Sequence, residues 1–223
     1  MAKVIAVTDA VKSLSEVEVK FGLKRSQDQS FFSEWRAELP ELTEAEIKAL
    51  NTIQRRLEYH RAEGDLLEEA VMLLVASPLL EAAGFYDPPF LMKAEAAVEL
   101  TVDDGEEILR GWIDVLILQA QFWALVLESK KTTISIRSAL PQILAYMMAN
   151  PNQSTQPLFG CLTNGDDVLF IKLINQPNAQ YDLSRVFTLY TLSSEFSAVL
   201  QILKHIGQVI TEPYRGSQAD SAP

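Results

Sequence analysis

The chain has 223 residues, a formal net charge of −11 and 48% hydrophobic residues. This length suits one sizeable globular domain, and no apolar run reaches the roughly 18 residues that a membrane span requires. Residues 1–114 hold 23 acidic and 12 basic residues, whereas residues 115–223 hold seven of each. The acidic excess argues against a general nucleic-acid-binding protein.

Cysteine and histidine are scarce, which limits the metal and redox chemistry that we expect. The single cysteine, Cys161, excludes an intramolecular disulfide and is typical of a reducing cytoplasm. The two histidines, His60 and His205, lie far apart in sequence, so a zinc site is not expected. Any metal would therefore have oxygen ligands, as Mg²⁺ or Mn²⁺ prefers. Charges throughout residues 1–20 are unlike a secretory signal, and we expect a cytoplasmic protein without a membrane anchor.

The first third of the chain predicts helices. Residues 1–40 are mixed, with a short strand indicated over 4–7. Thr43 and Glu46 form a capping-box pattern, and the helical spacing of apolar residues then predicts a helix over 44–61. Residues 65–76 are apolar nearly all round, which indicates a buried helix. A further short helix begins at Ser77-Pro78 and ends at Gly84.

The middle of the chain predicts three consecutive strands. Residues 93–102 and 106–118 flank the turn signal Asp103-Asp104-Gly105. A short turn at 119–121 leads to a third strand over 122–130. Trp112 and Trp123, on these strands, are expected in the core.

A helix is predicted within 135–149, with Pro141 in its first turn. A hairpin follows over 157–163 and 167–174, then a helix over 193–211 and a tail from 216 that we expect to be disordered. This order of elements predicts an α/β (α+β) fold with a mixed central sheet. We expect an N-terminal extension over 1–64, one domain over 65–215 and the tail over 216–223.

Three charged side chains stand out in the predicted strands. Asp114 interrupts an apolar strand, and Glu128 and Lys130, two residues apart, project from one face of the next strand. The turn between the strands would bring Asp114 near Glu128. Two carboxylates and an ammonium are costly to bury without a reason, and a divalent metal would supply one.

Asp114, thirteen residues and then Glu128-Ser129-Lys130 resemble the motif of the PD-(D/E)XK nuclease superfamily. Gln142 and Tyr146, four apart on the following helix, are similar to the Gln-x-x-x-Tyr of RecB-like nucleases and of the nuclease domain of type I restriction enzyme R subunits. The resemblance covers roughly residues 66–205. It implies a restriction-endonuclease-like αβββαβ core.

The resemblance also implies roles for these residues. Asp114 and Glu128 would hold Mg²⁺, or Mn²⁺, and Lys130 would orient the attacking water or stabilise negative charge. Gln142 and Tyr146 would support the site. An acid on the first core helix would complete the metal shell, with Glu68 the first candidate and Glu69 the second.

The function that this implies is a Mg²⁺-dependent endonuclease acting on DNA. No Gly-x-x-x-x-Gly-Lys-Ser/Thr sequence occurs in the chain, so we expect no ATP site and a nuclease module without a helicase. The alternatives are an inactive nuclease-fold binding or assembly subunit, and a nuclease acting on RNA or branched DNA. A homodimer or a partner protein would supply DNA affinity that the acidic chain lacks.

Overall fold

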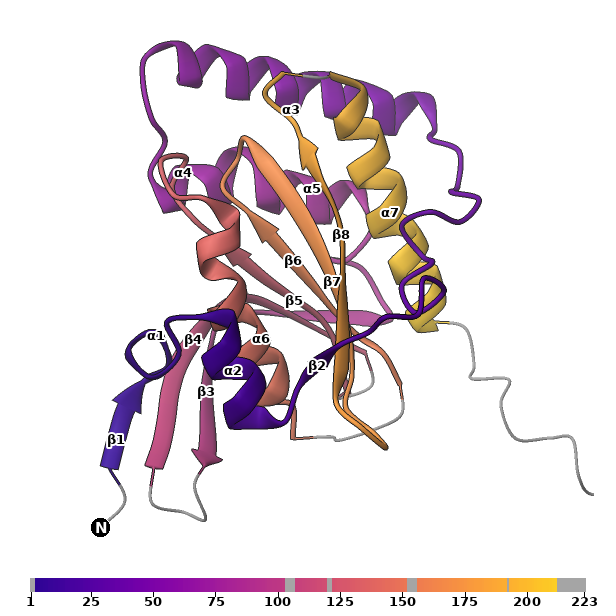
Figure 1. The fold of residues 1–223 in the computed structure, drawn as a ribbon. Helices are drawn as coiled ribbons and strands as arrows, with labels where there is room; N and C mark the ends of the chain where they lie inside the picture. Colours follow the sequence, from indigo (N-terminus) through magenta and orange to yellow (C-terminus); the bar gives the residue numbers. More distant parts are fainter. Residues whose placement is uncertain (1–2, 103–106, 120–121, 152–155, 192, 212–223) are drawn as a thin grey trace, which may run out of the picture.

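A mixed sheet of eight strands forms the centre of the molecule, and helices cover both of its faces (Figure 1). The computed structural model describes residues 3–102, 107–119, 122–151, 156–191 and 193–211. The predicted turn at 103–105, residues 120–121 of the second turn, and the tail over 216–223 lie outside these residues. The predicted fold class, α/β with a mixed sheet between helices, is confirmed.

The strand order is β1-β4-β5-β6-β7-β8-β2, and β3 pairs with the other edge of β4. Three pairs, β1 with β4, β2 with β8 and β5 with β6, are parallel, and the remaining pairs are antiparallel. The strands are β1 Lys3–Ala6, β2 Lys24–Arg25, β3 Phe90–Val102, β4 Glu107–Gln119, β5 Phe122–Ser129, β6 Leu158–Thr163, β7 Asp167–Ile174 and β8 Gln180–Thr188.

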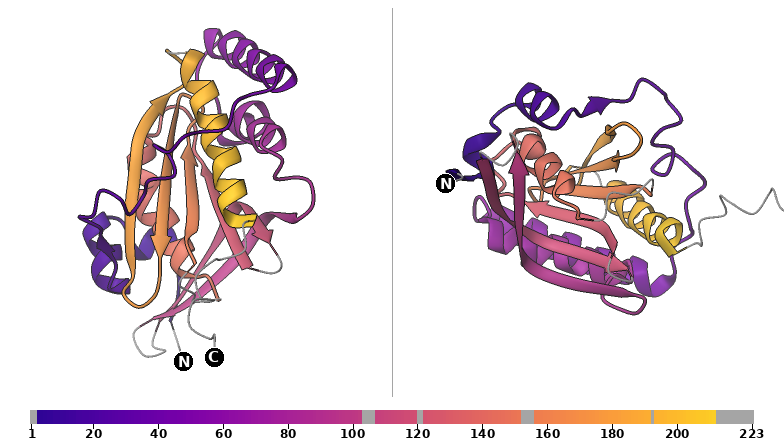
Figure 2. Two further views of the ribbon diagram at one scale, coloured as in Figure 1. Left: turned by 90° about the vertical axis from the view of Figure 1, so that its right-hand side faces the viewer. Right: turned by 90° about the horizontal axis from the view of Figure 1, so that it is seen from below.

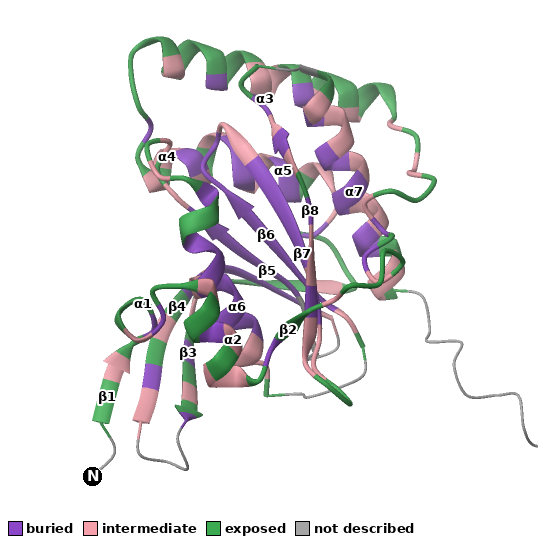
Figure 3. Cartoon of the chain, in the orientation of Figure 1, coloured by how far each residue is buried: buried purple, intermediate pink, exposed green. Residues whose placement is uncertain are grey.

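Two separate apolar cores lie on the two faces of this sheet. Figure 2 shows the helices on either side of the sheet, and Figure 3 shows which parts of the chain are buried. One face is covered by α1 Val7–Ala10, α2 Leu14–Phe21, the 3₁₀ turn Ile136–Ala139 and α6 Leu140–Met148. The other face is covered by α5 Ser77–Ala82, α7 Ser193–Thr211 and, packed on these two helices, α3 Glu44–Ala62. The sheet therefore lies in the middle of three layers, as the apolar strands require.

The predicted capping box at α3 is present. The Thr43 side chain accepts a hydrogen bond from the Glu46 backbone, and the Glu46 carboxylate accepts one from the Thr43 backbone. Sequence analysis missed a second box of the same kind, formed by Ser13 and Glu16 at the start of α2. This helix ends at Gly22, whose φ of 61° is in the left-handed region that favours glycine.

The helix predicted over 65–76 begins later and has an unexpected centre. Its first turn is α4, Glu68–Val71, and the chain continues through a π-helical segment, Met72–Ala76, into α5 without a break. The predicted short helix from Ser77 is present as α5, but Ser77 does not cap it, because the π-helical segment runs into α5. Hydrophobic patterns do not distinguish a π turn from an α turn, because both bury the same apolar side chains.

Residues 1–64 contribute to both ends of the sheet. β1 pairs with β4, β2 pairs with β8, and the Lys172 ammonium on β7 forms an ion pair with Glu34 in the loop before α3. The division of the chain at residue 64 stays a prediction. Across the part of the chain that the structure describes, no helix combines the length and the apolar character needed to cross a bilayer.

Two further expectations differ from the structure. Sequence analysis gave no strand for β8, although Tyr181 and Phe187 are buried at its ends. Trp112 is 64% exposed, so its assignment to the core is wrong, whereas Trp123 is half-buried. An apolar strand pattern does not reveal which stretch of a long strand the helices cover.

Candidate metal centre

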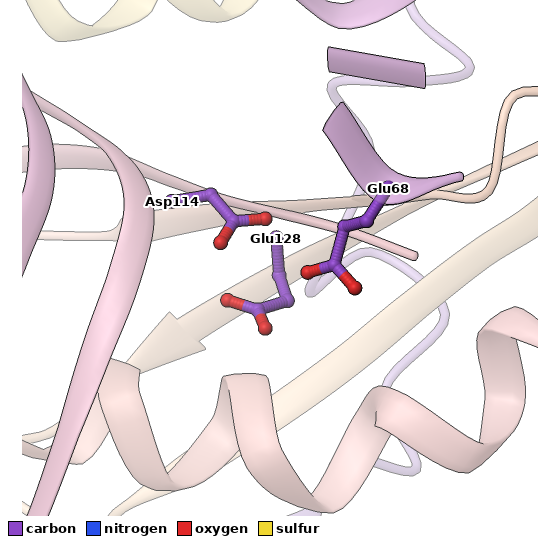
Figure 4. Close-up of side chains that lie close together, drawn as sticks. All are labelled: Glu68, Asp114 and Glu128. Carbon is purple, nitrogen blue, oxygen red and sulfur yellow. The ribbon is translucent and has the colours of Figure 1, made fainter. Parts of the chain in front are cut away.

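The candidate site lies at an opening in the sheet beside the middle of β4. On one edge of this strand, β1 pairs with Glu107–Arg110 and β5 pairs with Val115–Gln119. Between these two stretches, residues 111–114 have no strand partner on that edge among the described residues. At the same level β5 leaves β4 and pairs with β6 through Glu128 and Ser129. Asp114 and Glu128 thus face each other across the opening (Figure 4).

Ser129 fixes the Asp114 carboxylate. Its backbone N–H and its hydroxyl both donate to Oδ2 of Asp114, at 2.6 and 2.7 Å. Because both bonds go to one oxygen, they orient the carboxylate in the opening.

Glu68 comes from the other side of the opening, at the first position of α4. Two hydrogen bonds tie the loop before this helix to the loop after β5: Thr132 N–H donates to the Leu66 carbonyl at 3.1 Å, and Leu66 N–H donates to the Thr132 hydroxyl at 3.0 Å. The helix start is therefore held beside the end of β5. An acid at this position is also favoured by the helix dipole.

Glu68, Asp114 and Glu128 offer carboxylate oxygens that all lie within 4.8 Å of one another. Glu128 is 1% exposed, and its Oε2 is buried without a hydrogen-bond partner in the described part of the chain. Burial and the nearby Asp114 charge raise the pKa of Glu128 to about 8. An unpaired buried carboxylate oxygen between two further carboxylates is the donor set that a Mg²⁺- or Mn²⁺-sized cation needs.

Lys130 closes one side of this cluster. Its ammonium lies 2.7 Å from Oε1 of Glu128 and 3.4 Å from Oε1 of Glu68. Burial would lower the pKa of Lys130, but the surrounding carboxylates outweigh it and raise the pKa. Lys130 is therefore held as a cation at the edge of the cluster.

The Gln142 amide on α6 donates to Oε1 of Glu128 at 2.5 Å and to the Tyr146 hydroxyl at 2.9 Å. The Tyr146 ring lies against Gly111, where an added Cβ would be 2.5 Å from Cε1 of the ring. Tyr146 thus occupies the part of the opening that a side chain at position 111 would fill. Burial and the Glu128 charge raise the pKa of its hydroxyl, so it stays protonated.

The structure brings together the six residues singled out from the sequence: Asp114, Glu128, Lys130, Gln142, Tyr146 and Glu68. Glu69, the second candidate on α4, is exposed and lies outside the acidic cluster. Sequence reasoning missed Ser129, Thr132 and Gly111. Ser129 could have been predicted, because it lies between the motif residues Glu128 and Lys130. Thr132 in a loop and Gly111 in a strand belong to no sequence pattern, and only the fold places them at the site.

Fold and site together define a mixed α/β protein with a carboxylate cluster at an opening in its central sheet. Comparison of the structure with solved structures finds a partial match to a fragment described as an HsdR subunit of a type I restriction enzyme from Vibrio vulnificus. The TM-score is 0.40 with 18% identity, over 61% of this chain and 25% of that one, so the match spans about a quarter of the solved fragment's length. No family model and no curated protein matches the sequence.

Proposed function

We propose that this protein is a metal-dependent nuclease of the PD-(D/E)XK type that hydrolyses phosphodiester bonds in DNA, similar to an R-subunit nuclease module without a helicase. The observation that carries the proposal is the buried, unpaired Oε2 of Glu128 within a cluster of three carboxylates and one lysine. The sequence resemblance supports it through the same residues.

Each side chain then has a chemical role. Glu68, Asp114 and Glu128 would hold Mg²⁺ or Mn²⁺, which would polarise the phosphate and lower the pKa of a bound water. Lys130, 2.7 Å from Glu128, would stabilise the negative charge that develops on the phosphate. Gln142 and Tyr146 hold the Glu128 carboxylate in place through the amide bridge.

The test is cleavage of supercoiled plasmid with Mg²⁺ or Mn²⁺ by the wild type and by two matched lysine variants. Lys130→Ala should slow cleavage by about 10²–10³-fold. Lys131→Ala removes the same charge from the adjacent, exposed position and should leave the rate unchanged. Equal rates for the two variants would show that Lys130 has no part in the chemistry.

Metal binding without chemistry is tested by thermal unfolding at increasing Mg²⁺ or Mn²⁺. A metal that binds only the folded state raises its stability by RT ln(1 + [M]/Kd). Glu128→Ala should abolish this rise. Stabilisation by metal with no cleavage of plasmid, RNA or branched DNA would favour the alternative, an inactive nuclease-fold subunit. No stabilisation and no cleavage would contradict the proposed nuclease.

A further inference from the structure

A groove on the α2 and α6 face of the sheet has a charge opposite to that of the chain as a whole. It has a volume of about 640 Å³ and lies between the start of α2, the turn before α6, and strands β7 and β8. Four basic residues, Lys12, Arg25, Arg137 and Arg185, line it, and no acidic residue does among those that the structure describes. The chain as a whole carries a net charge of −11.

The four cations are not equivalent. Arg25 donates to Asp182 at 3.1 Å, and Arg185 makes two bonds to Glu195, at 2.7 and 3.0 Å. These two are partly neutralised by their partners.

Lys12 and Arg137 are exposed, and no described residue forms an ion pair or hydrogen bond with the charged end of either side chain. Two unpaired cations that line one groove repel each other, and an anion bound between them would offset this repulsion. An anionic ligand is therefore the occupant that the charges favour.

The groove is close to the carboxylate cluster along the chain. Arg137 follows Lys130 by seven residues, so their Cα atoms are at most about 25 Å apart. Phosphates follow one another every 3.4 Å along each strand of duplex DNA. A strand with one phosphate at the cluster thus reaches Arg137 within about seven nucleotides.

We propose that this basic groove binds the phosphodiester backbone of the DNA whose cleavage at the carboxylate cluster is proposed above. The inference rests on that proposed function and adds to it the substrate's path over the protein surface. The backbone is a row of regularly spaced anions, which suits a groove lined by four basic side chains better than a single small anion does. The groove cations are not part of the carboxylate cluster, so we expect them to contribute affinity rather than chemistry.

The experiment measures binding of a fluorescent 20-base-pair DNA duplex by anisotropy, in EDTA so that no cleavage occurs. The variant is Lys12→Glu with Arg137→Glu. The control is Lys48→Glu with Arg55→Glu, which makes the same change in net charge at two exposed positions of α3, on the opposite face. We expect at least ten-fold weaker binding for the groove variant than for the control. The slope of log K against log salt should fall by about 2, one for each lost phosphate contact.

Equal affinities for the groove variant and the control would overturn the proposal. So would a groove variant that loses stabilisation by inorganic phosphate while binding the duplex normally, because the groove would then serve a small anion. In cleavage assays the groove variant should raise KM and leave kcat near the wild-type value. A wild type that binds the duplex through the groove but never cuts would refute the nuclease function alone, and one that cuts with the groove variant unimpaired would refute the groove alone.

Discussion

Replacing Glu128 with Gln should stabilise the metal-free protein. The pKa of Glu128 is about 8, against an ordinary value of 4.5, because of burial and the Asp114 charge. At pH 7 the folded chain must therefore hold a proton that the unfolded chain has released. The cost is 1.36 kcal/mol for each pH unit above the unfolded pKa, or about 3 kcal/mol at pH 7. Gln has the same shape as protonated Glu and removes this cost.

The sign of the pH dependence follows from the same shift. Between the unfolded pKa near 4.5 and the folded pKa near 8, the native state binds more protons than the unfolded state. Stability of the wild type therefore falls, as far as this group is concerned, as pH rises through that window. The advantage of Glu128→Gln should be below about 1 kcal/mol at pH 5 and reach about 3 kcal/mol at pH 7.

Urea unfolding in EDTA at pH 5 and pH 7 measures both values. The control is Glu69→Gln, a change of the same kind at an exposed neighbour of the cluster, which should alter stability by less than about 0.5 kcal/mol. Mg²⁺ should stabilise the wild type and leave Glu128→Gln unchanged. If Glu128→Gln were less stable than the wild type at pH 7, or if its advantage did not grow with pH, Glu128 would not be a buried carboxyl opposed by its surroundings.

Three further experiments test contacts and burial at other positions of the fold. Gly111→Ala should cost about 1–3 kcal/mol in urea unfolding and slow any cleavage, because its Cβ would displace the Tyr146 ring; a neutral result would mean that the ring moves freely. Arg61→Lys should cost about 1–3 kcal/mol, since lysine cannot reproduce the two bonds of 2.9 Å to Asp166, and unchanged stability would show that the pair contributes nothing. Cys161, buried with a pKa raised to about 12, should react with a thiol reagent at pH 8 only at the rate of unfolding; rapid reaction of the folded protein would contradict its burial.

The sequence predicted the order of the central elements because their patterns are local. The helix at 44–61 has a capping box, and the strands around Asp114 and Glu128 are continuous apolar runs between turn signals. The same rule, applied to Ser13 and Glu16, would have predicted α2, because these two residues form a capping-box pattern in the sequence.

Other features depend on long-range contacts and leave no local pattern. The opening beside β4 exists because β1, from the start of the chain, and β5 share one edge of that strand. The exposure of Trp112 likewise depends on which stretch of β4 the helices cover. The basic groove unites positions as distant as Lys12 and Arg185, which no reading of neighbouring residues would connect.

The π-helical segment at 72–76 sets how far the turn that begins at Glu68 is rotated about the helix axis relative to α5. Each residue of an α-helix turns the chain by about 100°. The wider π turn therefore changes the direction of the side chains before it, including Glu68, while α5 keeps its apolar face on the sheet. The angle at which Glu68 meets the other two carboxylates is thus set by the length of a segment that contributes no carboxylate to the cluster. A related chain with one residue fewer in 72–76 would keep every acidic residue of the cluster, but its Glu68 side chain would point away from the other two carboxylates.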